Sequence, residues 1–222
     1  MIGLVQKPLE EIYEMIKPFK RVLIVGCETC AAMSEAGGIR QAEVLKRALE
    51  LHYKLEGTDV ELKTTSVLRQ CDKSIVREGL GDLVANGNLD AILSMACGAG
   101  VQTVAEVFPS VPVLPACNTV MIGSHDRDEG LISEVCKACG ECLLHETGGI
   151  CPLTRCAKGL LNGPCGGQVN GKCEVGGWTR DCAWVLIYER LKEQGRLDLF
   201  TKFRPPRDWS ISQSPREIKV RI

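Results

Sequence analysis

The chain has 222 residues with 45% hydrophobic composition, which is enough to bury a sizeable core in one domain, with or without a small appendage. Its net charge of −1 gives no reason to expect nucleic acid or another polyanion as a partner. No stretch approaches the roughly 18 uninterrupted apolar residues of a membrane span, and Glu10, Glu11 and Glu14 stand where a signal peptide would need an apolar run. We therefore expect a cytoplasmic protein.

The N-terminal part of the chain alternates between strand and helix patterns. Residues 1–20 predict a short amphipathic helix with Pro8 near its start. RVLIVGC is an apolar run ending in Gly and Cys, as in a buried parallel strand. In this way strands are expected at 21–27, 59–68, 90–97 and 111–117, with helices in 36–55, 71–87 and 100–108. In 36–55 the roughly helical spacing of Ile39, Val44, Leu45, Ala48 and Leu49 predicts a helix of about four turns.

This alternation predicts an α/β domain over residues 1–128, with a doubly wound parallel sheet of Rossmann or flavodoxin-like type and about four strands. Several cysteines fall near the C-terminal ends of these strands, the edge where open α/β sheets bind their ligands. A strand order of 2-1-3-4 would bring together Cys27, Cys30, Cys71 and Cys97. Cys117 would lie one strand further out. The alternative is that Cys71, Cys97 and Cys117 are ordinary buried small residues, a common role for free cysteine.

Residues 129–196 predict a separate metal-binding domain, because cysteine and glycine dominate and apolar residues are sparse. Cytosolic thiols stay reduced, so the clustered cysteines among the 13 of the chain are expected to be metal ligands rather than disulfides. The cysteines of this domain are Cys136, Cys139, Cys142, Cys151, Cys156, Cys165, Cys173 and Cys182. An amphipathic helix over 182–195 closes the domain, with Trp184, Ile187, Tyr188 and Leu191 as its packing face.

The spacing CxxCxxC of Cys136, Cys139 and Cys142 favours an iron–sulfur cluster over zinc, because a cubane offers several iron corners to one tight loop. Cys151-Pro152 follows after a longer gap than in bacterial ferredoxins, so the spacing leaves open which cysteine is the fourth ligand. The remaining cysteines, at 156, 165, 173 and 182, could hold a second cluster or a tetrahedral zinc. His145 could replace a thiolate in a zinc site, although a surface histidine is the simpler interpretation.

Residues 197–222 predict an extended basic and aromatic tail without periodicity. It is either a segment that docks onto a partner, because Trp and Arg are favoured interface anchors, or a tail that wraps its own domain. No catalytic triad or paired-carboxylate pattern stands out, and neither GAGVQT nor GGQVNGKC completes a nucleotide-binding loop. The sequence therefore does not predict that this chain transforms a small substrate by itself.

The stretch CKACGECLLHETGGICPLTRCAKGLLNGPCGGQVNGKCEV, followed by Cys182 and Trp184, resembles the cysteine-rich region associated with methylenetetrahydrofolate reductases. The preceding VLIVGCETCAAMSEAGG and ILSMACGAGVQT resemble the rest of the small, MetV-type subunit of such enzymes in anaerobic, acetogen-like bacteria. The resemblance covers about residues 20 to 210.

The resemblance implies a subunit that pairs with a larger (β/α)8-barrel subunit carrying FMN or FAD and binding the folate. Together they would reduce methylene-tetrahydrofolate to methyl-tetrahydrofolate in the reductive acetyl-CoA (Wood–Ljungdahl) pathway. This chain would carry two or three [4Fe–4S] clusters, or zinc in one site, and relay electrons from a further subunit or a soluble carrier to that flavin. The resemblance carries over as metal ligands Cys27, Cys30, Cys71 and Cys97, and every cysteine from 136 to 182, but not Cys117.

Two other functions stay open at this point. In the first, the metals are zinc and the chain is a structural or assembly subunit of the same complex. In the second, the chain is an iron–sulfur adaptor that links another flavin or corrinoid enzyme to a heterodisulfide-type electron supply. Redox-active iron would argue against the first function. Co-purification with a flavin-containing barrel protein would distinguish an electron-transfer subunit of the reductase from the second function.

Overall fold

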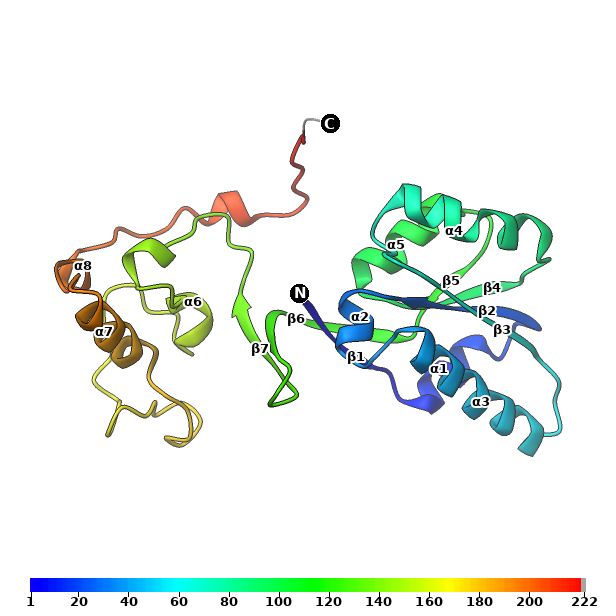
Figure 1. The fold of residues 1–222 in the computed structure, drawn as a ribbon, viewed down its shortest axis with the longest axis horizontal. Coiled ribbons are helices and arrows are strands. Elements are labelled where there is room, and N and C mark those ends of the chain that lie inside the picture. Colours follow the sequence, from blue (N-terminus) through cyan, green and yellow to red (C-terminus); the bar gives the residue numbers. More distant parts are fainter. Residues whose placement is uncertain (221–222) are drawn as a thin grey trace. The chain divides into compact units, whose positions relative to one another are not determined.

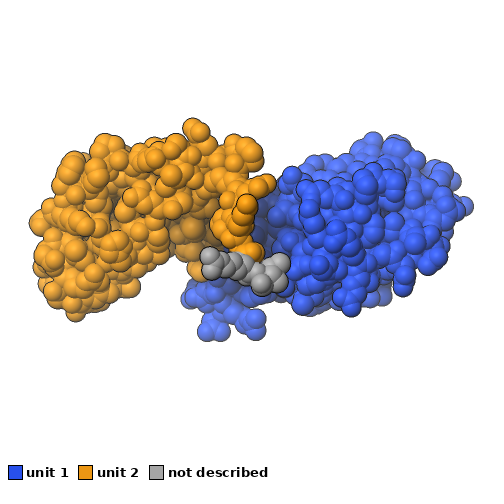
Figure 2. All heavy atoms as spheres, turned by 90° about the horizontal axis from the view of Figure 1, so that it is seen from above, with its two compact units in different colours: residues 1–121, 125–132 blue, residues 122–124, 133–222 orange. Residues whose placement is uncertain are grey.

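A computed structural model describes residues 1–220, so 221–222, the end of the expected tail, lie outside the described residues. The chain divides into two compact units (Figure 2). The first holds residues 1–121 and 125–132, and the second holds residues 122–124 and the chain from 133 onward. Among the described residues, no helix is both long and apolar enough to cross a bilayer.

The first unit is built on a four-stranded parallel sheet with the order β3-β2-β4-β5 (Figure 1). Its strands are β2 (Arg21–Cys27), β3 (Glu61–Val67), β4 (Ala91–Met95) and β5 (Val113–Pro115). In the register of the sheet, Val25 lies beside Thr65 on one side and Ser94 on the other. The predicted α/β fold is confirmed, and so is the 2-1-3-4 order of its strands.

Helices cover both faces of this sheet, and β2 shows why its sequence is apolar throughout. Val22 and Ile24 point to one core, while Leu23 and Val25 point to the other. On the first face lie helices α1 and α3, and on the second lie α4 and α5 (Figure 1). The helices of the unit are α1 (Leu9–Ile16), α2 (Cys30–Met33), α3 (Ile39–Leu55), α4 (Lys73–Asn86) and α5 (Gly98–Val107).

Helix boundaries follow local chemistry. The Asp72 carboxylate accepts hydrogen bonds from the backbone N–H groups of Ser74 and Ile75 and so caps α4, which ends at Asn86 as predicted. In α3 the buried face is Ala42, Leu45, Leu49 and Tyr53. Val44, which is part of the apolar spacing that predicted this helix, is 63% exposed.

A second sheet, which the sequence patterns did not reveal, has three strands in the order β1-β6-β7. These are β1 (Ile2–Gln6), β6 (Cys117–Asp126) and β7 (Leu131–Cys136). The short helix predicted in residues 1–20 is confirmed as α1, which begins directly after Pro8, but the strand β1 before it was not predicted. The turn between β6 and β7 is held by Asp126, whose carboxylate accepts from the N–H groups of Asp128 and Glu129.

The second unit has a small apolar core around one helix. Trp184, Ile187 and Leu191 of α7 are fully buried, and the Trp184 Nε1–H donates to the Leu160 carbonyl at 3.0 Å. Tyr188, expected on the same face, is partly exposed and meets the Phe200 ring edge-on. The short elements of this unit are η1 (Leu144–Glu146), α6 (Pro152–Arg155), α7 (Ala183–Glu193), α8 (Asp198–Thr201) and η2 (Trp209–Ser212).

Candidate metal centre

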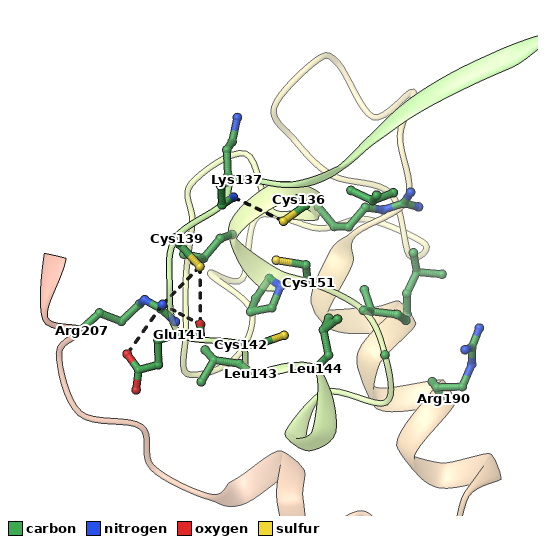
Figure 3. A pocket seen from close by; sticks show the side chains of 18 of the residues that line it. Cys136, Lys137, Cys139, Glu141, Cys142, Leu143, Leu144, Cys151, Arg190 and Arg207 are labelled. Carbon is green, nitrogen blue, oxygen red and sulfur yellow. Dashed lines mark hydrogen bonds and ion pairs between the residues drawn. The ribbon is translucent and has the colours of Figure 1, made fainter. Parts of the chain in front are cut away.

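Four cysteines of the second unit line one cavity of about 960 Å³ (Figure 3). Cys136 ends β7, Cys139 and Cys142 follow in the adjoining loop, and Cys151 directly precedes α6. The loop can fold this tightly because Ala138 and Gly140 adopt left-handed conformations, with φ of 50° and 85°. Cys151 thus lines the same cavity as the CxxCxxC triplet.

Two of these sulfurs receive hydrogen bonds from N–H groups. The Ala138 backbone N–H donates to Cys136 Sγ at 3.3 Å. The Arg207 Nη2 group donates to Cys139 Sγ at 3.2 Å and to the Glu141 carbonyl at 2.7 Å (Figure 3). Donors aimed at sulfur stabilise the thiolate form, which is the form that binds metal.

The cavity walls combine apolar side chains with charged ones of both signs. Leucine and isoleucine side chains form the apolar part, and basic side chains, including Arg190 of α7, lie beside the carboxylates of Glu141, Asp181, Glu189 and Glu193. The apolar and basic lining residues are Leu143, Leu144, Ile150, Leu153, Leu186, Lys137, Arg155, Arg190 and Arg207. Of these groups, the basic side chains are the ones that stabilise thiolates and anionic clusters.

The donor set fits a thiolate-bound metal centre. Four cysteines are the ligands of a [4Fe–4S] cluster and equally of a structural zinc ion. Within residues 1–220, no three Cys, His, Asp or Glu side chains stand in an arrangement that would hold a single metal ion. The four thiols therefore share one cavity with sulfur-directed donors, but they do not converge on a point.

The other cysteines of the second unit lie elsewhere in it. Cys156 and Cys182 pack against the small core around Trp184. Cys165 lies 3.6 Å from both Lys158 Nζ and Glu174 Oε1. The Cys173 N–H donates to the Arg180 carbonyl at 2.8 Å. None of these four is among the residues that line the cavity of Cys136, Cys139, Cys142 and Cys151.

His145 has an exposed side chain, and its carbonyl accepts a hydrogen bond from Arg196 at 2.7 Å. This placement fits the interpretation of a surface histidine.

In the first unit, Cys27, Cys30, Cys71 and Cys97 lie at the C-terminal edge of the parallel sheet, where the predicted order places them. Burial raises the pKa of the Cys71 thiol, and the neighbouring Cys97 and Cys27 raise it further. Burial, followed by the neighbouring Cys27 and Cys97, raises the pKa of Cys117 to about 12. The Cys117 thiol donates to the Ala36 carbonyl at 3.3 Å, a partner within its own unit.

The tail contributes residues that sequence reasoning missed. Arg204 is 4% exposed, and its Nε donates to the Glu146 carboxylate at 2.8 Å, which Lys202 also contacts. Hydrogen bonding to Lys202, and then to Arg204, holds the pKa of Glu146 below its usual range. Arg216 donates to the Ala138 carbonyl at 2.8 Å. The tail therefore wraps its own unit. The closely spaced basic residues at 202, 204 and 207 were the feature of the sequence that could have indicated these contacts.

Residues 114–210 match a family described as "Methylene-tetrahydrofolate reductase C terminal". This range contains every cysteine of the second unit together with Arg204 and Arg207, so the chain is related to methylene-tetrahydrofolate reductases through this region. The curated proteins provide no match.

Among solved structures, an extracellular ligand-binding receptor from Verminephrobacter eiseniae is similar at 11% identity with a TM-score of 0.35. The similarity covers 48% of this chain and 28% of the receptor, well under half of the receptor's length, and carries no argument about function.

Proposed function

We propose that this chain, with its methylene-tetrahydrofolate reductase-type region, is the iron–sulfur electron-transfer subunit of such a reductase complex. It relays electrons to the flavin, FMN or FAD, of a larger (β/α)8-barrel subunit that reduces methylene-tetrahydrofolate to methyl-tetrahydrofolate. The observation that carries the proposal is the cavity shared by Cys136, Cys139, Cys142 and Cys151 within the matched region. The folate reduction consumes two electrons and two protons, so the chain must receive electrons from a further subunit or a soluble carrier.

The residues of the chain have distinct tasks in this proposal. The four cavity cysteines hold the centre, and a bound [4Fe–4S] cluster would supply one-electron transfer there. Apolar side chains such as Leu143 and Ile150 line the same space, and a lower local dielectric constant beside them strengthens electrostatic contacts. Arg207 donates a hydrogen bond to Cys139 Sγ and brings positive charge to the thiolates.

The proposal assigns further centres to the other carried-over cysteines. Cys156, Cys165, Cys173 and Cys182 form the second set, in which zinc is the alternative to iron. Cys27, Cys30, Cys71 and Cys97 form a third set at the edge of the parallel sheet. Each set supplies four thiols, the donor number that a cluster or a tetrahedral zinc requires.

The test is electron delivery to flavin. The chain is produced without oxygen, reduced with dithionite, desalted, and mixed in a stopped-flow instrument with the oxidised flavin-containing barrel subunit. We expect wild-type chain to bleach the flavin absorbance and Cys139→Ser to slow that bleaching at least about tenfold, because a serine hydroxyl replaces a required thiolate ligand.

Cys117→Ala is the matched control, since the proposal gives Cys117 no ligand role, and it should behave like wild type. Flavin reduction at the wild-type rate by Cys139→Ser would contradict the proposal, as would no reduction by the wild-type chain.

A further inference from the structure

Arg207 is a buried arginine whose hydrogen-bonding capacity is only partly used. Its side chain is 3% exposed and lines the four-cysteine cavity. One of its nitrogens, Nη2, donates to Cys139 Sγ and to the Glu141 carbonyl. Among the described residues, Nε and Nη1 are buried without a hydrogen-bond partner. A buried guanidinium left in this state is costly, so its surroundings lack an acceptor that it requires.

Arg204, three positions earlier in the same tail, shows what a satisfied arginine looks like. Its side chain is as deeply buried, but every nitrogen has a partner. Nε donates to the Glu146 carboxylate, Nη1 to the carbonyls of Leu161 and Lys202, and Nη2 to those of Glu146 and Leu199. Because the donors of Arg204 are fully used by protein atoms, Arg204 is a structural anchor. Arg207 is left with donors for something else.

The charge of Arg207 is also incompletely compensated. Its nearest carboxylate oxygen, Glu141 Oε2, lies 3.6 Å away on a side chain that is 53% exposed. A solvated carboxylate at this distance neutralises a buried cation only in part. The Trp209 ring, 5.5 Å from the guanidinium carbon, adds a weak cation–π contact. The remaining positive charge lies beside Cys139, at the cavity (Figure 3).

We propose that Arg207 is a positioning residue that sets the reduction potential of the centre held by Cys136, Cys139, Cys142 and Cys151. The inference rests on the proposed function and deepens it. The guanidinium donates to the sulfur acceptors of that centre, which are the partners its free N–H groups lack. Reduction adds one electron and breaks no bond, so a nearby cation and N–H donors favour the reduced form and raise the potential.

The test is a redox titration of the full-length chain, purified without oxygen and poised with dithionite and mediator dyes, with EPR as the readout. We expect Arg207→Gln to shift the midpoint of this centre to a more negative potential than that of wild type. Arg207→Lys should fall between them, because lysine keeps the charge but loses the planar fork of donors.

Two further variants separate this effect from general charge and from folding. Glu141→Gln should shift the midpoint in the opposite direction, to a more positive potential, because it removes the negative charge that partly offsets Arg207. Arg190→Gln removes a second cation from the same cavity, one for which no hydrogen bond to sulfur is found among the described residues, and its shift should be smaller than that of Arg207→Gln. A merely structural role of Arg207 would not produce opposite shifts at residues 207 and 141.

The outcomes distinguish this inference from the function on which it rests. Wild-type protein that contains iron and sulfide, with an unchanged midpoint in both Arg207→Gln and Glu141→Gln, overturns the role of Arg207 alone. If Arg207→Gln does not fold, unchanged midpoints in Arg207→Lys and Glu141→Gln overturn it equally. Wild-type protein without any EPR-active iron overturns the proposed function and this inference with it.

Discussion

Glu146 is a carboxylate that the tail has enclosed. It lies 58 residues before Arg204 in the chain and is almost completely buried. Its carboxylate accepts hydrogen bonds from both Lys202 and Arg204. Because both cations lower its pKa, the ionised Glu146 carboxylate is more stable in the folded unit than in the unfolded chain. This group fastens residues 202–204 to η1, which leads directly from the triplet loop toward Cys151.

Glu146→Gln should therefore destabilise the second unit by about 2 kcal/mol at pH 7, since it removes the charge that pairs with a buried arginine. The pKa of Glu146 is lowered in the folded state, so its contribution is present above the ordinary carboxyl pKa of about 4.3 and is lost as the pH falls through the folded value. The difference between wild type and Glu146→Gln should thus be constant near neutral pH and narrow below about pH 4.

Tryptophan fluorescence in urea provides this measurement, because Trp178, Trp184 and Trp209 all belong to the second unit. Glu189→Gln, which removes an exposed ion pair with Lys192 on α7, is the control and should change stability by less than about 0.5 kcal/mol. A gap between wild type and Glu146→Gln that widens on acidification would contradict this account of Glu146.

Sequence reasoning found the cysteines but not the arginines at this scale, for a physical reason. CxxCxxC is a local spacing, so its metal-binding chemistry can be predicted without knowledge of the fold. The contacts of Arg204 with Glu146 and of Arg207 with Cys139 join residues 58 and 68 positions apart. In an aperiodic tail no local rule fixes such pairings, so the sequence left docking and wrapping as alternatives.

At the scale of elements, the parallel sheet was predictable because each strand carries its own signal. β2 is buried on both faces and is therefore continuously apolar, and α3 and α4 show helical spacing and caps. β6 was missed because much of it is exposed, so it has no apolar run and no clean alternation. β1 was missed because its short apolar run merges with the helix pattern that follows Pro8.

Gly37 shows how tightly these elements meet at the cysteine-bearing edge. A Cβ built on Gly37 would lie 2.1 Å from the carbonyl oxygen of Met95, the last residue of β4. The Gly37 carbonyl also accepts from the Cys27 N–H at 2.8 Å. Gly37→Ala should therefore destabilise the first unit by more than about 3 kcal/mol, because backbone atoms of two elements would have to move.

Gly81, inside α4, is the matched control. A Cβ built there meets nothing within 4 Å, so Gly81→Ala should stabilise the protein by about 0.5–1 kcal/mol through helix propensity. Far-UV circular dichroism in urea measures both changes. Equal effects of the two substitutions would contradict the close approach at Gly37.

At the scale of the whole molecule, the two units obtain their cores differently. The first buries apolar residues on both faces of its sheet. The described residues of the second form a core cluster of three buried side chains, those of Trp184, Ile187 and Leu191. Chain segments with so small a core commonly depend on bound metal for their fold. The composition of residues 129–196 pointed to this situation, but the grouping of cysteines by cavity required the folded chain, because their spacings allow several partitions.

The proposed function requires that the cysteines bind iron–sulfur clusters. Iron, zinc and acid-labile sulfide are therefore to be measured on the chain purified without oxygen, together with EPR after dithionite, for wild type, Cys151→Ser and Cys117→Ala. We predict about eight to twelve irons with matching sulfide in wild type and Cys117→Ala, and about four fewer irons in Cys151→Ser. Zinc alone in the wild-type protein, or an iron content that Cys151→Ser leaves unchanged, would contradict the proposed iron–sulfur function.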